Sequence, residues 1–236
     1  MKFTRGVRWV SGVVLAVVTS SFAAPAHAII AGQNAQLGEL PSVVAIGNKT
    51  VYASEGNLTN AAFCGGVLIS QRLVLTAAHC VVDFNTVTKQ PRVSVPAELV
   101  VGGGVIGLND MNGASVANVL RVDVTTDYLI SLITSAGDSS TDDIAVLQID
   151  ATLPGTQPVA LATAAQVAAI ENTPTLLTTA GWGDTDPQAQ GSYLPQLLRT
   201  SVTSVADGLC ADPHATFAVT SPDGLSMRAF KIGRAH

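Results

Sequence analysis

The segment Leu75–Cys80, which reads L-T-A-A-H-C, places a histidine between small residues and a cysteine. A second motif, F-C-G-G, lies a short distance upstream at Phe63–Gly66. A histidine that is held rigidly can serve as a general base if a carboxylate orients it and a nucleophile lies beside it. A lone histidine more often has no catalytic role. His79 is therefore a catalytic candidate whose role depends on partners elsewhere in the chain.

The elements that would position this histidine are predicted to be mainly strands. Short apolar runs rich in Val, Ile, Leu and Thr recur along the chain and are separated by turn residues. We expect strands at Ser42–Ile46, Cys64–Ile69, Leu73–Thr76, Glu98–Val101, Val116–Val124, Ile144–Ile149, Thr175–Thr179 and Leu197–Val202. Short helices are expected only at Ala164–Glu171 and Val205–Ala211, and surface loops at Asn48–Asn60, Asn109–Ser115 and Ser135–Thr141. With Ala151–Pro158 as the linker, the pattern predicts two all-β barrels, the second of which is short.

Four motifs, in the same order as in a known family, carry a resemblance to that family. The chain resembles the trypsin/chymotrypsin family of serine endopeptidases, peptidase S1, over about residues 29–211. The motifs are I-I-A-G at Ile29–Gly32, T-A-A-H-C at Thr76–Cys80, D-I-A at Asp143–Ala145 and G-W-G at Gly181–Gly183. The resemblance implies an all-β, double β-barrel, chymotrypsin-like fold, here with an incomplete second barrel.

The same resemblance assigns roles to individual residues. It implies that His79 is the general base, that Asp143 is the carboxylate orienting it, and that Asp142 is a solvated neighbour. It further implies a disulfide between Cys64 and Cys80. Closing that short loop would stabilise the fold by roughly 3 kcal/mol in the chain-entropy model. The expected substrates are polypeptides, and the expected reaction is their hydrolysis.

The nucleophile motif of the family, G-D-S-G-G, does not occur in the sequence. Gly137–Ser139 is a fragment of it, but this fragment lies ahead of Asp143 in a polar loop, and we interpret it as a chance match. Of the three cysteines Cys210 is left over, either as a free thiol or as a cysteine whose partner is missing from the sequence. These observations predict a serine peptidase fragment with an N-terminal barrel at 29–150, a partial C-terminal barrel at 151–224 and a non-native tail at 225–236. Two alternatives are a secreted, non-catalytic homologue that binds partners and an unrelated β-rich surface or adhesion protein.

The N-terminus has the pattern of a secretory signal peptide. Basic residues precede the apolar run Val10–Val18, and an A-x-A cleavage site ends at Ala28. A membrane anchor is the alternative, but polar residues interrupt a stretch that would need about 20 apolar residues to span a bilayer. We expect residues 1–28 to be removed, Ile29 to be the mature N-terminus and the product to be extracellular or periplasmic, with no membrane segment remaining.

Charge composition argues against nucleic acid as a partner. The formal net charge is −5, from 12 Lys and Arg against 17 Asp and Glu, and no basic block occurs. Nucleic-acid binding therefore has no electrostatic basis. The four histidines are scattered, so no metal site is predicted, and no cofactor is expected. The oligomeric state is left open.

Overall fold

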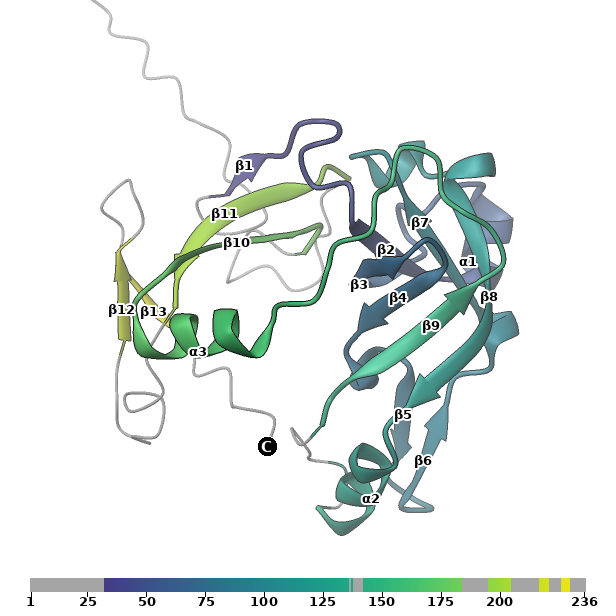
Figure 1. Ribbon diagram of the computed structural model, residues 1–236. Helices are drawn as coiled ribbons and strands as arrows, with labels where there is room; N and C mark the ends of the chain where they lie inside the picture. Colours follow the sequence, from purple (N-terminus) through teal and green to yellow (C-terminus); the bar gives the residue numbers. More distant parts are fainter. Residues whose placement is uncertain are drawn as a thin grey trace, which may run out of the picture.

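The structure, a computed structural model, describes residues 32–135, 137, 142–183, 195–204, 217–220 and 226–229. It consists mainly of β-strands, as the sequence predicts (Figure 1). Six strands close into an antiparallel barrel in the order β2-β3-β4-β9-β8-β7. Their bounds are β2 (Val43–Asn48), β3 (Ala62–Ser70), β4 (Leu73–Thr76), β7 (Leu99–Gly103), β8 (Val116–Val124) and β9 (Ala145–Ile149). All six correspond to runs predicted ahead of the linker, and β4 and β8 have the predicted bounds.

Alternation of side chains along each strand fills the barrel. In β9, Ala145, Leu147 and Ile149 are buried, whereas the intervening Val146 and Gln148 are partly exposed. This is the period of two that a half-buried strand requires. Buried side chains from the other strands complete the same cluster, among them Val44, Ile46, Leu68, Val74, Val101, Ala117 and Val119.

One helix lies where the sequence analysis placed a surface loop. Most of the predicted loop Asn48–Asn60 is in fact α1 (Lys49–Glu55), so that prediction is wrong there. The Asn48 side chain caps the helix by accepting hydrogen bonds from the backbone N–H groups of Thr50 (2.9 Å) and Val51 (3.1 Å). A side-chain cap of this kind satisfies donors that have no partner within the helix.

A second unpredicted helix, α2 (Thr126–Thr134), connects β8 to the segment that leads into β9. Thr125 caps it, and Tyr128 and Leu132, one turn apart, are its buried residues. The hairpin of β5 (Val82–Asn85) and β6 (Gln90–Val93) was also not predicted. Single turns of 3₁₀ helix occur at Ala78–Cys80, Pro96–Glu98, Leu108–Asp110 and Gly113–Ser115, and the last two largely occupy the predicted loop Asn109–Ser115.

The second half is an open sheet in the described residues. Strands β1 (Gln33–Asn34), β11 (Leu198–Thr203) and β10 (Leu176–Gly181) pair antiparallel in the order β1-β11-β10. Helix α3 (Ala164–Asn172) matches the predicted helix at 164–171. Strands β12 (Phe217–Thr220) and β13 (Ser226–Ala229) form a separate hairpin. The helix predicted at Val205–Ala211 lies outside the described residues.

The two halves are joined through the G-W-G motif. The Trp182 ring is buried, and its Nε1–H donates to the Ile106 carbonyl oxygen at 2.9 Å. It belongs to a second apolar cluster on the outer side of the barrel, with Leu58, Val100, Leu108, Met111 and Leu197. The motif therefore has an architectural role, because its tryptophan packs the two halves together.

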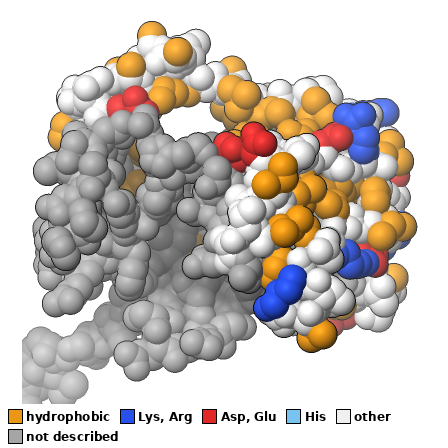
Figure 2. All heavy atoms as spheres, turned by 90° about the horizontal axis from the view of Figure 1, so that it is seen from below, with side chains coloured by type: hydrophobic (Ala, Val, Ile, Leu, Met, Phe, Trp, Pro, Cys, Tyr) orange, Lys and Arg blue, Asp and Glu red, His pale blue; other side chains and the backbone are white. Residues whose placement is uncertain are grey.

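The surface carries few charged groups. On the described part of the face drawn in Figure 2, Lys and Arg side chains form a few separate spots, some of them beside Asp or Glu side chains, and most of the face is hydrophobic or uncharged. Within the ranges that the structure describes, no helix has the length and apolarity needed to cross a membrane.

Candidate active site

The barrel topology brings His79 and Asp143 to the same end of two neighbouring strands. Strands β4 and β9 are antiparallel partners, and their register ends with Thr76 opposite Ala145. His79 comes three residues after Thr76, and Asp143 comes two residues before Ala145. Because one strand leaves the barrel where the other enters it, the two residues meet although 64 positions separate them.

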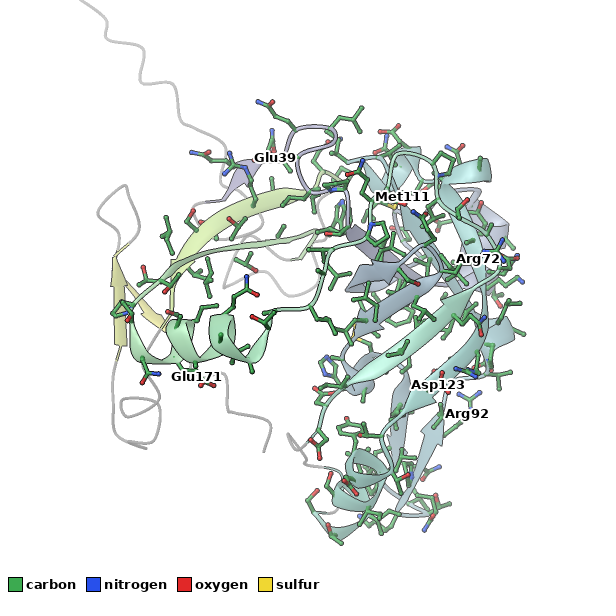
Figure 3. The ribbon with its side chains drawn as sticks, viewed as in Figure 1. Glu39, Arg72, Arg92, Met111, Asp123 and Glu171 are labelled. Carbon is green, nitrogen blue, oxygen red and sulfur yellow. A yellow bond between two sulfur atoms is a disulfide. The ribbon has the colours of Figure 1, made fainter. Side chains whose placement is uncertain are left out.

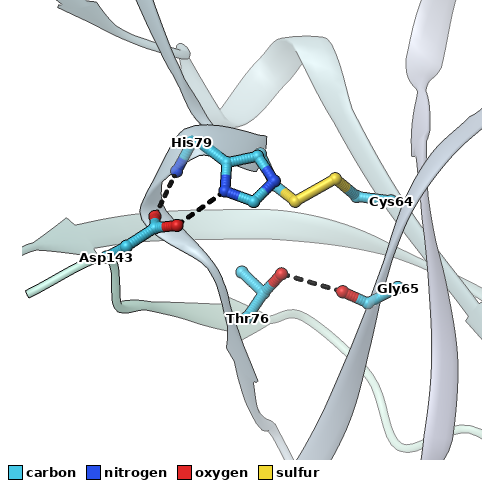
Figure 4. Close-up of a disulfide and its surroundings, with 6 residues drawn as sticks. Cys64, Gly65, Thr76, His79 and Asp143 are labelled. Atoms are coloured by element: carbon cyan, nitrogen blue, oxygen red, sulfur yellow. Dashed lines mark hydrogen bonds and ion pairs between the residues drawn. A yellow bond between two sulfur atoms is a disulfide. The ribbon is translucent and has the colours of Figure 1, made fainter. Parts of the chain in front are cut away.

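Asp143 holds the histidine at two points (Figure 4). One carboxylate oxygen, Oδ2, lies 2.7 Å from His79 Nδ1, and the other, Oδ1, accepts from the His79 backbone N–H at 2.8 Å. A carboxylate can only accept, so Nδ1 carries the proton and Nε2 of the neutral ring keeps its lone pair. The His79 side chain is 63% exposed and that of Asp143 is 25% exposed. The His79 ring is thus held by Asp143 on its Nδ1 side, and most of the ring is exposed to solvent.

The segment that carries the histidine is cross-linked to β3. Cys64 and Cys80 form a disulfide with a Cα–Cα distance of 6.0 Å, in the pairing that the family resemblance implies. Next to it, the buried Thr76 hydroxyl donates to the Gly65 carbonyl oxygen at 2.8 Å. The covalent bond and the hydrogen bond both join β3 to the chain around His79, which limits the movement of its backbone.

A strained turn orients the aspartate. Asp142 has a φ of 51°, in the left-handed region that non-glycine residues seldom adopt. Its carbonyl oxygen accepts from the Thr125 hydroxyl (3.0 Å) and from the Ile144 backbone N–H (2.7 Å). The backbone of Asp142 therefore sets the direction in which the Asp143 side chain leaves the chain.

Helix α2, which sequence reasoning missed, contributes to the surroundings of the pair. Burial raises the pKa of the Tyr128 hydroxyl above its ordinary value, and the negative charge of Asp143 raises that pKa further. The Tyr128 hydroxyl on α2 therefore lies close enough to Asp143 to be affected by its charge. The signal available in the sequence was a capping threonine followed by apolar residues one turn apart.

Two grooves border the site. One, of about 610 Å³, is lined by His79 and the disulfide, and its polar wall includes Asp83, Arg92 and Glu98. Arg92 pairs with Glu98 at 2.6 Å and lies 3.6 Å from Asp83. The other, of about 620 Å³, is lined by β3 residues on one side and by Gly181–Gly183 on the other. Both volumes lie within the range of about 300–1,000 Å³ that is typical of ligand pockets in proteins.

Of the other residues that the sequence analysis singled out, the structure describes only some. Gly137 is described, but the rest of the G-D-S fragment, Ile29 and Cys210 lie outside the described residues. Cys64, His79 and Cys80 also form a group of residue types that can ligate a metal, which sequence reasoning overlooked because it considered only the spacing of histidines.

This arrangement, a histidine held by a carboxylate at the end of a six-stranded barrel, agrees with comparisons to known proteins. The family model described as Trypsin matches residues 29–222, and the chain belongs to this family of trypsin-like serine proteases. It is 28% identical over 199 residues to Trypsin zeta of Drosophila erecta, covering 82% of this chain and 61% of that protein. It is 31% identical over 187 residues to Serine protease SP24D of Anopheles gambiae, covering 77% of this chain and 55% of that protein.

A solved structure shares the fold. The VesB protease of Vibrio cholerae aligns with a TM-score of 0.57 and 26% sequence identity, over 80% of this chain and 51% of that one. The chain thus spans a little over half the length of these relatives.

Proposed function

We propose that this chain is part of an exported serine endopeptidase in which His79 is the general base and Asp143 the residue that orients it. The single observation that supports this most strongly is the two-point hold of Asp143 on His79, through Nδ1 at 2.7 Å and the backbone N–H at 2.8 Å. It fixes the tautomer in which Nε2 can accept a proton, and it can stabilise the imidazolium that forms when the proton arrives.

In this mechanism Nε2 of His79 takes the proton of a serine hydroxyl as that oxygen attacks the peptide carbonyl carbon. His79 then gives the proton to the leaving amine. Water attacks the acyl-enzyme in the same way, with His79 again taking a proton and then returning it to the serine oxygen. Asp143 stays ionised throughout. The G-D-S-G-G segment that would supply the serine is not in the printed sequence. We infer that residues 151–224 are part of a second barrel and that the native sequence departs from the printed one within 225–236.

Two experiments test this proposal. Sequencing the gene beyond codon 224 should reveal G-D-S-G-G in frame. The protein encoded by that sequence should react with a fluorophosphonate serine-hydrolase probe, whereas its His79→Ala variant and the chain as printed should not. Labelling of the printed chain would require a nucleophile other than the one proposed, and labelling that survives His79→Ala would remove His79 from the mechanism.

The second candidate function is that of a secreted, non-catalytic homologue that binds partners. The missing G-D-S-G-G motif is the observation that favours it. A downstream sequence in which another residue stands at the serine position would support this alternative and exclude the peptidase.

Export and maturation form part of the same proposal. Ala26-His27-Ala28 directly precedes Ile29, so signal peptidase alone would expose the isoleucine. N-terminal sequencing of the exported protein should begin at Ile29. A start several residues away would indicate a separate propeptide.

A further inference from the structure

Three side chains that can bind a soft or borderline metal ion meet at the disulfide. Ligand atoms of Cys64, His79 and Cys80 all lie within 4.8 Å of one another. The two cysteines are partly buried, and the histidine ring is largely exposed. As long as the disulfide is intact, its sulfurs are not thiolates and cannot act as zinc ligands.

We propose that reduction of the Cys64–Cys80 disulfide converts this group into a Zn²⁺ site with a Cys₂His donor set and a fourth position open to solvent. A dithiol supplies two electrons and two protons: the protein S–S bond breaks to give two thiols, and the dithiol becomes a cyclic disulfide. Zn²⁺ then displaces the two thiol protons and binds both thiolates and the ring. Two cysteines, one histidine and an open fourth position is a known arrangement for zinc.

The hydrogen bonds around His79 already suit this role. Asp143 accepts from Nδ1–H, which leaves Nε2 as the metal ligand (Figure 4). Zinc-bound histidines almost always donate their other N–H to a carboxylate or carbonyl group, and this contact fixes the ring and raises its basicity.

The backbone around the cysteines should remain in place after reduction. Strands β3 and β4 pair through Val67 and Leu75, and the Thr76 hydroxyl holds the carbonyl oxygen next to Cys64. Neither contact depends on the S–S bond. The two sulfurs can therefore separate to the spacing of zinc ligands without a change in the strands that carry them.

Zinc at this site would occupy the lone pair that the proposed general base needs. This consequence rests on the proposed function, and it would make the reduced, zinc-loaded enzyme inactive. The metal site itself does not depend on peptidase activity. It can therefore be tested in the printed chain.

The test uses residues 29–236 without a histidine tag, with Cys210→Ser so that only two cysteines remain. The protein is reduced with a dithiol, freed of reductant under anaerobic conditions, and titrated with Zn²⁺ against a chromophoric chelator. We expect one equivalent to bind to the reduced form and none to the oxidised form. Co²⁺ should give a thiolate-to-metal charge-transfer band.

Asp143→Ala should weaken Zn²⁺ binding by about 10–100-fold, and His79→Ala should weaken it by at least as much. His214→Ala, the matched control, should change nothing.

Equal binding by oxidised protein would overturn the site, as would an unchanged affinity in His79→Ala. A reduced chain that loses its near-UV circular dichroism, and does not regain it with Zn²⁺, would also overturn it. Because no outcome uses enzymatic turnover, zinc binding without probe labelling of the extended protein would reject only the proposed function. Labelling without zinc binding would reject only the metal site.

Discussion

The two halves of the chain differ in how completely their described residues pack against one another. In the first half six strands close on themselves, and side chains such as Leu147 and Val74 are completely buried. In the second half helix α3 has no buried residue, and Leu176 of β10 and Leu161 are 70% and 63% exposed. A closed barrel has no free strand edges, whereas an open sheet has them. The His79–Asp143 pair lies in the first half, at the end of the closed barrel.

The halves are nevertheless tied together. Strand β1, which precedes the barrel, pairs with β11, and the Leu108 N–H donates to the Pro195 carbonyl oxygen at 2.7 Å. Glu39, which is labelled in Figure 3, lies on the loop between β1 and β2. It forms an ion pair with Arg199 of β11 at 2.5 Å. Substitutions can therefore be compared at three places: the His79–Asp143 site, the core of the barrel and this connection between the halves.

The largest effect is expected at the site. In the sequence-extended peptidase, Asp143→Asn should lower kcat by about 10⁴-fold, because an amide can donate to Nδ1 and favour the tautomer whose Nε2 is already protonated. Asp142→Asn, the control, should have little effect, because the contacts that position Asp142 use its backbone carbonyl oxygen. Steady-state kinetics measures both variants. Equal losses in the two would contradict the assignment of Asp143.

A smaller effect should distinguish the barrel core from the second half. Leu147→Ala removes a completely buried side chain and should cost about 2–5 kcal/mol of unfolding free energy. Leu176→Ala, the same substitution at an exposed position, should change it by less than about 0.5 kcal/mol. Denaturant unfolding of the printed chain compares them. A large loss in Leu176→Ala would mean that β10 is packed as tightly as the barrel.

The smallest effect concerns the connection between the halves. A backbone hydrogen bond from Gln36 and, next, the Arg199 guanidinium lower the pKa of Glu39 below its ordinary value of 4.5. The Glu39 contribution to stability is therefore present above pH 4.5 and is lost as pH falls through the lowered pKa. The stability difference between the wild type and Glu39→Gln should shrink below pH 4.5. A difference that does not vary with pH would exclude an ionic role.

Local patterns in the sequence predicted the barrel but not all of its surroundings. The strand runs at Leu73–Thr76 and Val116–Val124 have apolar periodicity and flanking turns that need no distant information. Helix α1 was missed because Asn48 stands in a polar stretch and was taken for a loop residue, although it is a capping residue. The pairing of β1 with β11 joins residues about 165 positions apart, and no local pattern specifies such a contact.

The family motifs in the sequence pointed to His79 and Asp143, but not to the features that hold them. The left-handed turn at Asp142 and its hydrogen bond from Thr125 depend on α2, which the sequence analysis did not predict. The metal-ligand group at Cys64, His79 and Cys80 arises because β3 and β4 are neighbours. Such features depend on tertiary register, which motif spacing alone does not reveal.

The central claim is that the fold of the first barrel alone brings His79 Nδ1 into hydrogen-bond contact with the Asp143 carboxylate, without a nucleophile beside the pair. It is tested most directly by proton NMR of the printed chain with ¹⁵N-labelled histidine, recorded at low temperature. If the pair is formed, the spectrum should contain a strongly downfield Nδ1–H resonance that is absent in His79→Ala, moves upfield in Asp143→Ala and is unchanged in His214→Ala. A spectrum without this resonance, or one that Asp143→Ala leaves unaltered, would contradict it.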